Sequence, residues 1–492
     1  MLSHRGPDRF CYPYQPSCVE NTRLVHHVGQ ALFFPIAGSA RTERALCSVQ
    51  QRVQSGEALA GVSRSDGSSF PVNAMFSLLP SLPPAPPNSR HVSPWPACAA
   101  SMAIGVLVAL AAWYPGHWQA LLLLQPAGWS RVRGRATAFA LWAGYYLAGA
   151  RDIPLVSMRF FSGYGEFTKP EALLLGVTFW IGQALLLSTP WALLKPAAHA
   201  SAASHAARAV IATLFVTVPP LGIIGWLSPV YVASALFPGW KLPGLILGVV
   251  VLACAASVSR CRLARYVTTL LFTLSIVANS SATVPPAPSR WVSLDTRLGR
   301  LDQSNYAQLY ARTQHVQLLA EHAFAAGAAV VILPEEIVGL WRPAMGYWWH
   351  DDVQAFAAAR QTLIFGTDLT VSSPQFRYTD SAVIVGGNYG RVDSRQPVPA
   401  ALWRPGAAVS AIRGSLTQRY AVVSGKSVAF SMCYEDLLWW PHWHLLLHPP
   451  NALISLSNSW FDSDLALAPI QQQAIAAIAR LSGVSLLRAM NR

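Results

Sequence analysis

A carboxylate and a thiol each follow a short apolar run in the last third of the chain. Val330–Leu333 leads through a proline to Glu335, and Ala429–Met432 leads directly to Cys433. Apolar runs of this length favour buried strands, and α/β folds place their ligands at strand ends. A carboxylate beside a thiol can act as a general base and generate the thiolate that attacks a carbonyl. The two runs therefore predict a cysteine-dependent site; a solvated Glu and a buried, inert Cys are the alternative.

The elements that would position these two residues alternate between strands and helices. Strands are predicted at 291–294, 330–333, 362–366, 382–385, 428–432, 452–456 and 484–487, and helices at 305–326 and 466–481. Strands flanked by helices imply a layered α/β domain, here over residues 291–492. A stiff Pro-rich linker, residues 283–290, precedes this domain.

Composition separates the rest of the chain from this domain. The 492 residues are 53% apolar and only 12% charged, whereas soluble proteins carry about a quarter charged residues. The deficit is concentrated in residues 96–282, which we predict to be a transmembrane domain of about seven helices. The apolar segments are 97–114, 117–129, 136–150, 172–194, 209–226, 242–259 and 266–281. Residues 1–95, rich in Pro, Ser and Arg and without a sustained period, are predicted to be a disordered extension.

The charges of the loops predict the orientation of these segments. Three alternate loops are basic and contain neither Asp nor Glu; their basic residues are Arg131, Arg133, Arg135, Lys195, Arg208, Arg260, Arg262 and Arg265. The loops at 152–171 and 227–241 are mixed or nearly neutral. The positive-inside rule then predicts a cytoplasmic N-terminus and a periplasmic C-terminal domain on an inner membrane. The net charge of +14 resides in no Lys/Arg block with interleaved aromatics, so we predict no nucleic-acid partner.

The segments around the candidate site resemble a known superfamily. Leu333–Glu335 (Leu-Pro-Glu) and Cys433–Glu435 (Cys-Tyr-Glu) look like signature segments of the nitrilase, or carbon–nitrogen hydrolase, superfamily. Asn458–Phe461 and Arg488–Asn491 continue the resemblance in the same order. The resemblance implies an αββα sandwich.

Two families of that superfamily share the whole architecture. A multi-pass membrane half followed by a nitrilase-like domain resembles apolipoprotein N-acyltransferase. Tyr145–Asp152, Gln396–Pro399 and Leu486–Ala489 are similar to the TraB family of conjugal transfer proteins. The resemblance covers roughly residues 97–491.

The superfamily implies a Glu–Lys–Cys triad that needs no cofactor. Mapped onto this chain, Glu335 is the general base and Cys433 the nucleophile that forms an acyl-enzyme. Ser394 stands at the position of the lysine, which stabilises the tetrahedral intermediate, and the adjacent Arg395 is the tentative substitute. Lys426, the only lysine after residue 241, precedes Cys433 by seven residues, or about 23 Å along an extended strand.

Further residues are predicted around this site. Glu435 is a candidate second carboxylate near the nucleophile, and Asn458 and Trp460 are candidates to line the pocket, with a plain strand-end turn as the alternative. The acyltransferase carries a further glutamate at the position of Leu402 and continues beyond the position of Arg492, so the domain is predicted to be C-terminally short. No Cys/His cluster has zinc spacing, and we predict no metal site.

Three functions remain open from the sequence. The first is Cys-dependent acyl transfer or amide hydrolysis in conjugal plasmid transfer or pilus maturation, with a membrane lipid or lipid-modified protein as substrate. The second is a catalytically impaired component that binds other proteins of the conjugation apparatus, which the missing lysine favours. The third is an enzyme like apolipoprotein N-acyltransferase. A nitrilase domain on a passive anchor is disfavoured, because seven spans exceed what an anchor requires.

Overall fold

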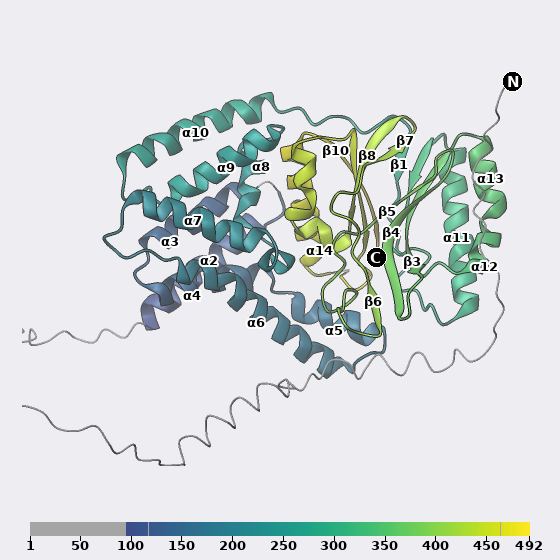
Figure 1. The fold of residues 1–492 in the computed structure, drawn as a ribbon, viewed down its shortest axis with the longest axis horizontal. Helices are drawn as coiled ribbons and strands as arrows, with labels where there is room; N and C mark the ends of the chain where they lie inside the picture. Colours follow the sequence, from purple (N-terminus) through teal and green to yellow (C-terminus); the bar gives the residue numbers. More distant parts are fainter. Residues whose placement is uncertain (1–94, 117, 463) are drawn as a thin grey trace, which may run out of the picture. The chain divides into compact units, whose positions relative to one another are not determined.

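A computed structural model of the chain describes residues 95–116, 118–462 and 464–492. The extension predicted for residues 1–95 therefore lies, except for its last residue, outside the described residues. Residues 95–492 form one compact unit. This unit has a helical region, residues 95–281, and an α/β region, residues 291–492 (Figure 1).

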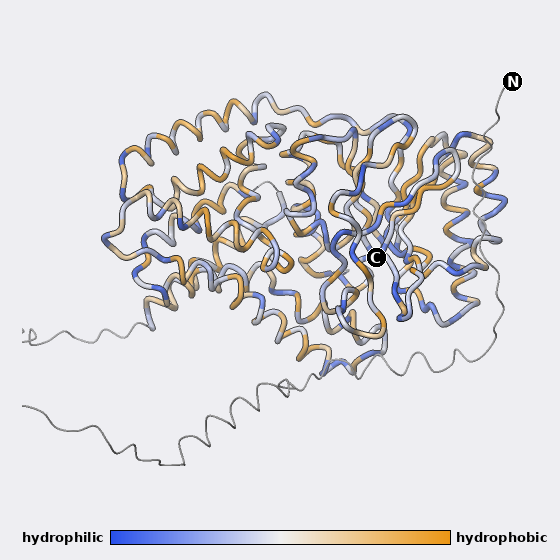
Figure 2. The backbone as a smooth tube through the Cα atoms, in the orientation of Figure 1, coloured by the Kyte–Doolittle hydropathy of each residue, from blue (hydrophilic) through white to orange (hydrophobic). Residues whose placement is uncertain are grey.

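The helical region contains a helix at each of the seven predicted apolar segments. Its elements are α2 (Trp95–Ala112), η3 (Trp118–Leu123), α3 (Leu124–Arg131), α4 (Arg135–Gly149), α5 (Ile153–Gly163), α6 (Lys169–Leu193), α7 (Ala202–Thr217), η4 (Leu221–Ile224), η5 (Pro229–Tyr231), α8 (Val232–Leu236), α9 (Lys241–Ala255) and α10 (Arg262–Ser281). Figure 2 shows how strongly apolar residues dominate these helices. Among the described residues, α2 and α6 are long and apolar enough to cross a membrane, and α7 and α9 are shorter apolar helices. Seven crossings therefore stay a prediction.

One stretch of this region differs from the sequence expectation. The stretch 152–171, predicted as a loop, contains the 11-residue helix α5. It is followed by a capping box at the start of α6, in which Glu171 accepts hydrogen bonds from the backbone N–H and the hydroxyl of Thr168, at 2.9 and 2.7 Å. Such a box fixes the first turn of a helix, so α5 and α6 meet at a defined corner.

The α/β region contains every strand and both helices that the sequence predicts. Its elements are β1 (Trp291–Ser293), α11 (Tyr306–Ala325), β2 (Val330–Ile332), α12 (Pro343–Trp348), α13 (His350–Ala358), β3 (Thr362–Val371), β4 (Phe376–Gly386), β5 (Gly390–Asp393), β6 (Val409–Ala411), β7 (Ala421–Val423), β8 (Lys426–Met432), η6 (Cys433–Leu437), η7 (Trp440–Leu446), β9 (Ala452–Asn458), α14 (Leu467–Ser482) and β10 (Ser485–Asn491). The unpredicted strands β5, β6 and β7 have three or four residues each, too few for a period of two to be recognised.

The strands form two stacked sheets. One has the order β1-β2-β3-β4-β5 with β6 beside β4, and the other has the order β10-β9-β8-β7. Alternate residues of both, among them Ile332, Ile364, Phe430 and Ile454, meet in a shared core, as expected for a period of two. Helices α11 to α13 cover the outer face of the first sheet and α14 that of the second (Figure 1). The layer order α-β-β-α is the one that the resemblance to the nitrilase superfamily implies.

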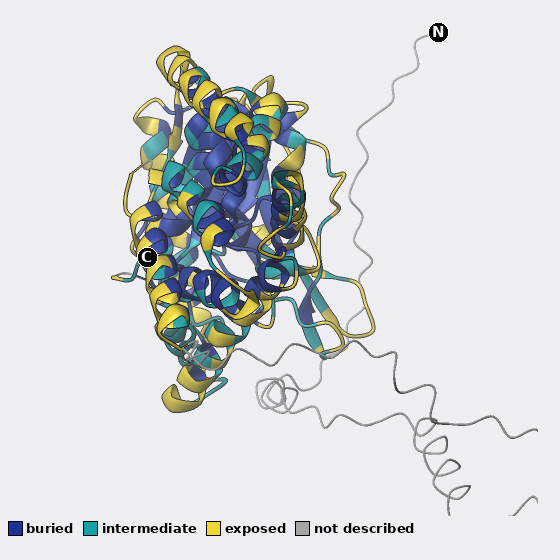
Figure 3. Ribbon diagram, turned by 90° about the vertical axis from the view of Figure 1, so that its left-hand side faces the viewer, coloured by how far each residue is buried: buried dark blue, intermediate teal, exposed yellow. Residues whose placement is uncertain are grey.

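The helical region joins the α/β region through one continuous core. Buried residues of α14, such as Ile475, and of the segment after Cys433, such as Leu438, belong to the same cluster as Leu236 of α8. Figure 3 shows buried segments gathered at the centre and exposed segments on the outer faces of the helices. The α/β layers are therefore packed against the helices rather than tethered to them by the linker alone.

Candidate active site

Glu335 and Cys433 lie together where the two sheets end. Glu335 follows β2 after Leu333 and Pro334, and Cys433 follows β8 directly. The Cys433 thiol and the Glu335 carboxyl group lie close enough for each to shift the pKa of the other. Glu335 is buried and Cys433 is half-buried. The sequence analysis assigned the role of general base to Glu335 and not to Glu336, and in the structure Glu335 is the residue that contacts the thiol.

The backbone on both sides of the site adopts a conformation that side chains rarely take. Cys433 has φ 37° and Glu336 has φ 48°. Non-glycine residues in this left-handed region cost free energy and are concentrated at functional sites. The turn at Cys433 ends β8 and begins η6, so the thiol lies at the edge of the sheet.

Close packing of the strands fixes the position of Glu335. Gly366 of β3 lies so near the turn after β2 that a Cβ atom there would be 2.3 Å from the Glu335 Cα atom. The backbone N–H of Asn458 donates a 2.8 Å hydrogen bond to Glu335 Oε2 and also contacts the Cys433 sulfur. Asn458 ends β9, which is parallel to β8, so adjacent strand ends supply the thiol and this donor.

A second carboxyl group, Asp380 of β4, contacts Glu335. Glu335 and Asp380 lie close enough for each to shift the pKa of the other, and Asp380 Oδ1 has no hydrogen-bond partner among the described residues. Two carboxyl groups this close share a proton, because adjacent like charges in a buried site repel. Asp380 is opposite Asp368 of β3 in the register. The sequence analysis missed Asp380; its only signal is an acidic residue two positions before the predicted strand 382–385.

Burial and mutual repulsion keep the protons on this cluster. Burial, followed by the charge of Asp380, raises the pKa of Glu335 well above its ordinary value. Burial, followed by the charge of Glu435, raises the pKa of Asp380 to about 8. Burial and the charge of Glu335 raise the pKa of the Cys433 thiol. The backbone N–H of Asn458 offsets part of this rise. The resting nucleophile is therefore a thiol that must lose its proton during the reaction.

Glu435, a predicted second carboxylate, is an anchor for the segment that contains Ser394 and Arg395. Its Oε1 atom accepts hydrogen bonds from the Ser394 hydroxyl at 3.1 Å, the Gln396 N–H at 3.0 Å and the Arg395 N–H. Its Oε2 atom accepts a bond from the Met432 N–H at 3.3 Å. Glu435 thus ties the segment after β5 to the strand that ends at the nucleophile.

Arg395, the tentative substitute for the lysine, is buried beside Glu435. Its Nη1 atom donates to the Phe430 carbonyl oxygen at 3.2 Å and lies 3.9 Å from Glu435 Oε2. Within the described part of the chain, no hydrogen bond or ion pair joins Arg395 to Cys433 or Glu335. Lys426 is at the far end of β8 from Cys433, as the sequence predicts. The structure thus brings Glu335, Cys433 and Asn458 together, but not Arg395.

The remaining predicted residue, Trp460, is turned toward the helical region. Its ring packs against Phe160, with ring centroids 6.2 Å apart, and against Tyr164 at 5.7 Å. Tyr164, which directly follows α5, lies near enough to Glu336 to lower the pKa of that carboxyl group. The sequence analysis assigned no role to Tyr164, because it treated residues 152–171 as a loop.

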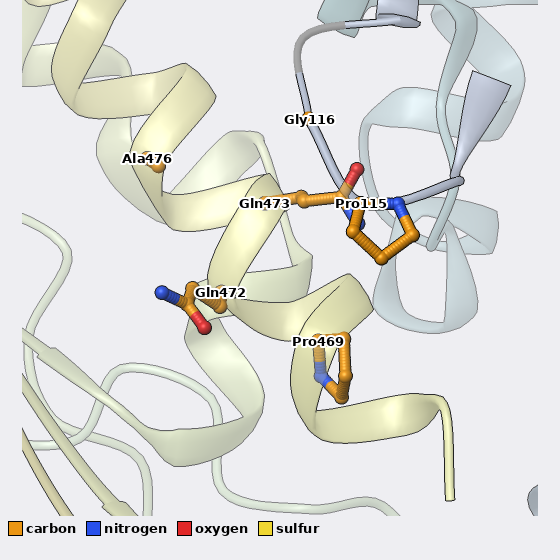
Figure 4. Close-up of a pocket in the computed structure, with 6 residues that line it drawn as sticks. All are labelled: Pro115, Gly116, Pro469, Gln472, Gln473 and Ala476. Carbon is orange, nitrogen blue, oxygen red and sulfur yellow. The ribbon is translucent and has the colours of Figure 1, made fainter.

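A separate cavity of about 250 Å³ lies between the segment after α2 and helix α14. Figure 4 shows its lining, which includes Pro115, Pro469 and Gln473. None of the predicted site residues lines it. The Cys433 site and this cavity are therefore different features.

Two curated proteins are similar to this chain over most of its length. The probable conjugal transfer protein TraB of Sinorhizobium fredii is 27% identical over 420 residues, which cover 82% of this chain and 99% of that protein. The conjugal transfer protein TraB of Agrobacterium fabrum is 28% identical over 411 residues, which cover 76% of this chain and 88% of that protein. No family model matches the sequence. The predicted resemblance to TraB proteins is confirmed by these relatives.

Solved structures that are similar to part of this chain include members of the nitrilase superfamily. A mutant amidase of this superfamily from Nesterenkonia has 15% sequence identity and a TM-score of 0.30, over 42% of this chain and 79% of the amidase. A carbon–nitrogen hydrolase from Helicobacter pylori has 14% identity and a TM-score of 0.30, over 41% of this chain and 72% of the hydrolase.

Proposed function

We propose that this chain is a membrane-bound enzyme that uses Cys433 for acyl transfer or amide hydrolysis. The contact between the Cys433 thiol and the Glu335 carboxyl group carries the proposal. In the first step, Glu335 takes the thiol proton, the sulfur attacks a carbonyl carbon, and the leaving group departs with the proton from Glu335. In the second step, an amine or water attacks the thioester, and the thiol regains its proton through Glu335.

The helical region supports a position in a membrane. Exposed apolar side chains line α10, where Leu263, Leu270 and Ile276 are 64% to 67% exposed. Exposed apolar surface of this extent is typical of a binding surface or of lipid contact. An inner-membrane location with about seven spans accounts for this surface and for the lack of charge in residues 96–282.

The contacts of the loops support the predicted orientation. The basic loops contact one another: Ser130 and Ser259 lie 3.4 Å apart, and Arg260 donates to the Ala198 carbonyl oxygen at 2.6 Å. The mixed or neutral loops contact the α/β region instead. A cytoplasmic N-terminus and a periplasmic α/β region are consistent with both groups of contacts.

The biological setting follows from the relatives. Both are named conjugal transfer proteins, so a role in conjugal plasmid transfer or pilus maturation is the setting we favour. A site packed against a membrane region suits a lipid or a lipid-modified protein as the substrate. An activity like that of apolipoprotein N-acyltransferase is one form of this chemistry.

A second candidate function is that of a catalytically impaired component of the conjugation apparatus. The position of Arg395 favours it, because this buried cation contacts Glu435 and not the thiol. A nucleophilic cysteine is ordinarily activated by a nearby positive charge, whereas the groups around Cys433 raise its pKa.

The substitution Glu335→Gln separates the two functions, because losing a general base and losing a negative charge change the rate of Cys433 alkylation in opposite directions. Glu335→Gln removes a general base, which slows alkylation of Cys433, but it also removes a negative charge, which lowers the pKa of Cys433 and speeds alkylation. Membranes containing the full chain are treated with iodoacetamide at pH 7, and modification of Cys433 is quantified by peptide mass spectrometry. Cys261 of the same chain is the internal reference, and Cys433→Ala verifies the assignment. Slower labelling in Glu335→Gln supports the enzyme; equal or faster labelling contradicts a general-base role.

A further inference from the structure

The outer face of the second sheet changes from apolar to hydroxyl-bearing toward the ends of its strands. Ala429 of β8 and Leu453 of β9 belong to the core that contains α14. Because side chains alternate with a period of two, Ser431 shares the face of Ala429, and Ser455 and Ser457 share that of Leu453. All three serines are buried, and Ser431 is paired with Ser455 in the register. Buried hydroxyl groups at two neighbouring strand ends require hydrogen-bond partners.

Asp436 accepts the hydrogen bonds of these hydroxyl groups. Ser431 Oγ donates to Asp436 Oδ1 at 2.5 Å, and Ser455 Oγ donates to Asp436 Oδ2 at 2.8 Å. Ser457 Oγ also donates to Asp436 Oδ2, at 3.4 Å. Asp436 is buried and lies in η6, three residues after Cys433. The turn that follows the nucleophile is therefore fastened to the ends of both β8 and β9.

Gln471 of α14 connects this cluster to the nucleophile. Its Nε2 atom donates to the Cys433 carbonyl oxygen at 2.9 Å and to Asp436 Oδ2 at 3.0 Å. The same atom lies 3.0 Å from Ser457 Oγ. The amide has two hydrogens for these three acceptors, and the Gln471 side chain is buried. Asp436 thus orients the amide group that holds the carbonyl group of Cys433.

The bond to this carbonyl group acts on a strained residue. Cys433 has φ 37°, and a non-glycine residue stays in such a conformation only where its surroundings hold it there. The peptide unit between Cys433 and Tyr434 is planar, so a bond to its carbonyl oxygen resists rotation of the whole unit. Rotation of that unit would change the direction of the thiol. Gln471 therefore helps to fix where the thiol points.

The same amide reaches the strand end that holds Glu335. Ser457 directly precedes Asn458, whose backbone N–H donates a 2.8 Å hydrogen bond to Glu335 Oε2. Gln471 thus contacts β8, which ends at the thiol, and β9, which supplies a donor to the carboxyl group. The placement of the thiol relative to Glu335 depends on this one side chain of α14.

The helical region fixes α14 from its other side. The backbone N–H of Ala466, just before α14, donates to Asp152 Oδ2 at 2.6 Å. Gln473 Nε2 donates to the Trp113 carbonyl oxygen at 3.2 Å. Buried apolar residues of α14 also belong to the core shared with the helical region. The position of Gln471 is therefore set by the helical region as well as by the sheet.

We propose that Gln471 is a positioning residue of the active site, whose amide, oriented by Asp436, holds the turn at Cys433 so that the thiol stays within reach of Glu335. Gln471 contacts the backbone of the nucleophile and not its sulfur, so it acts through Cys433. This inference rests on the proposed function, in which Glu335 is the general base, and adds a contribution from α14.

The positioning role is tested by a cycle of two substitutions. Full-length protein in membranes is treated with iodoacetamide at pH 7, and the rate at Cys433 relative to Cys261 is measured. The proteins are the wild type, Gln471→Met, Glu335→Gln and the double variant. Gln471→Met keeps the length of the side chain without its amide and should slow labelling about tenfold, a part of what a general base contributes. In the Glu335→Gln background it should change the rate by less than about twofold, because no base remains to be aligned.

The matched control is Gln473→Met, two residues along the same helix. It removes an amide that bonds to Trp113 and Gln119 in the helical region, so it should leave labelling of Cys433 at the wild-type rate. Gln471→Asn is the second variant, should Gln471→Met not accumulate in membranes. It keeps a buried amide but, being one methylene shorter, withdraws it from the Cys433 carbonyl group, so it should also slow labelling.

Three results would overturn the inference and leave the proposed function intact, provided that Glu335→Gln labels slowly. They are equal slowing by Gln471→Met in both backgrounds, slowing of the same size in Gln473→Met, and wild-type labelling in both Gln471 variants. Labelling of Glu335→Gln at or above the wild-type rate is a different outcome. It overturns the proposed function and, with it, the positioning role.

Discussion

The indole N–H of Trp226 donates a 2.6 Å hydrogen bond to the hydroxyl of Tyr434, the residue next to the candidate nucleophile. The same hydroxyl donates to the Ile223 carbonyl oxygen at 2.7 Å. Two further bonds join the segment after Cys433 to residues 219–231: Tyr231 donates to the Leu437 carbonyl oxygen and Trp440 to that of Gly222, each at 3.1 Å. The helical region therefore supports the turn that presents Cys433, which a passive anchor would not do.

Removing the Tyr434 hydroxyl tests this support. Tyr434→Phe leaves the Trp226 N–H and the Ile223 carbonyl group without their partner, and a buried unsatisfied group costs about 1–3 kcal/mol. We expect a lower thermal unfolding midpoint in detergent and altered labelling of Cys433. The control is Tyr420→Phe, which removes a single exposed bond to the His448 carbonyl oxygen. Equal effects of the two substitutions would contradict a special role for the Trp226–Tyr434 contact.

The close approach of β3 to Glu335 yields a second prediction. In Gly366→Ala, the new Cβ atom would lie 2.3 Å from the Glu335 Cα atom and 2.9 Å from the Glu336 nitrogen. The turn must move, so we expect a loss of about 1–3 kcal/mol, as for other overpacked cores, together with slower labelling of Cys433. Gly346→Ala is the control, because its Cβ atom meets nothing within 4 Å and alanine favours a helix. Normal labelling in Gly366→Ala would show that the site tolerates a displaced Glu335.

The raised pKa of Asp380 predicts how stability depends on pH. Its folded pKa is about 8, above the ordinary aspartate value of about 3.9. A raised carboxyl pKa means that the stability from this group is complete at low pH and is lost as pH rises toward 8. The loss is at most about 1.4 kcal/mol per pH unit. Asp380→Asn stays neutral, so its unfolding midpoint should fall less between pH 6 and pH 8 than that of the wild type. Parallel curves would mean that Asp380 is ionised in the native protein.

The sequence predicted the reacting pair because each residue follows a recognisable strand. Glu335 and Cys433 stand at the ends of apolar runs, where α/β folds place their ligands, and the stacking of the two sheets brings the ends of β2 and β8 together. The alternation of strands and helices predicted a layered α/β domain, whereas the order α-β-β-α was implied by the resemblance to the nitrilase superfamily. Tyr164 was not predictable, because its place depends on the contact between α5 and Trp460, which are about 300 residues apart in the chain. Asp380 was missed because only the pairing of sheets shows which face of β4 its side chain occupies.

The environment of Arg395 provides the last prediction and tests whether this residue replaces the lysine of the nitrilase superfamily. Its guanidinium is buried beside Glu435 and the Phe430 carbonyl group, so Arg395→Met leaves a buried carboxylate without its cation, at a cost of about 3 kcal/mol or more. Arg391→Met is the control, because Arg391 is more exposed and pairs with Asp393; exposed pairs contribute about 1 kcal/mol or less. We expect Arg395→Met to lower the thermal unfolding midpoint strongly. At temperatures well below that midpoint, we expect Cys433 of this variant to be alkylated at the wild-type rate. A stable Arg395→Met protein with a slow Cys433 would instead assign the guanidinium to the reaction, since only a group that stabilises the attacking thiolate could slow labelling without affecting the fold.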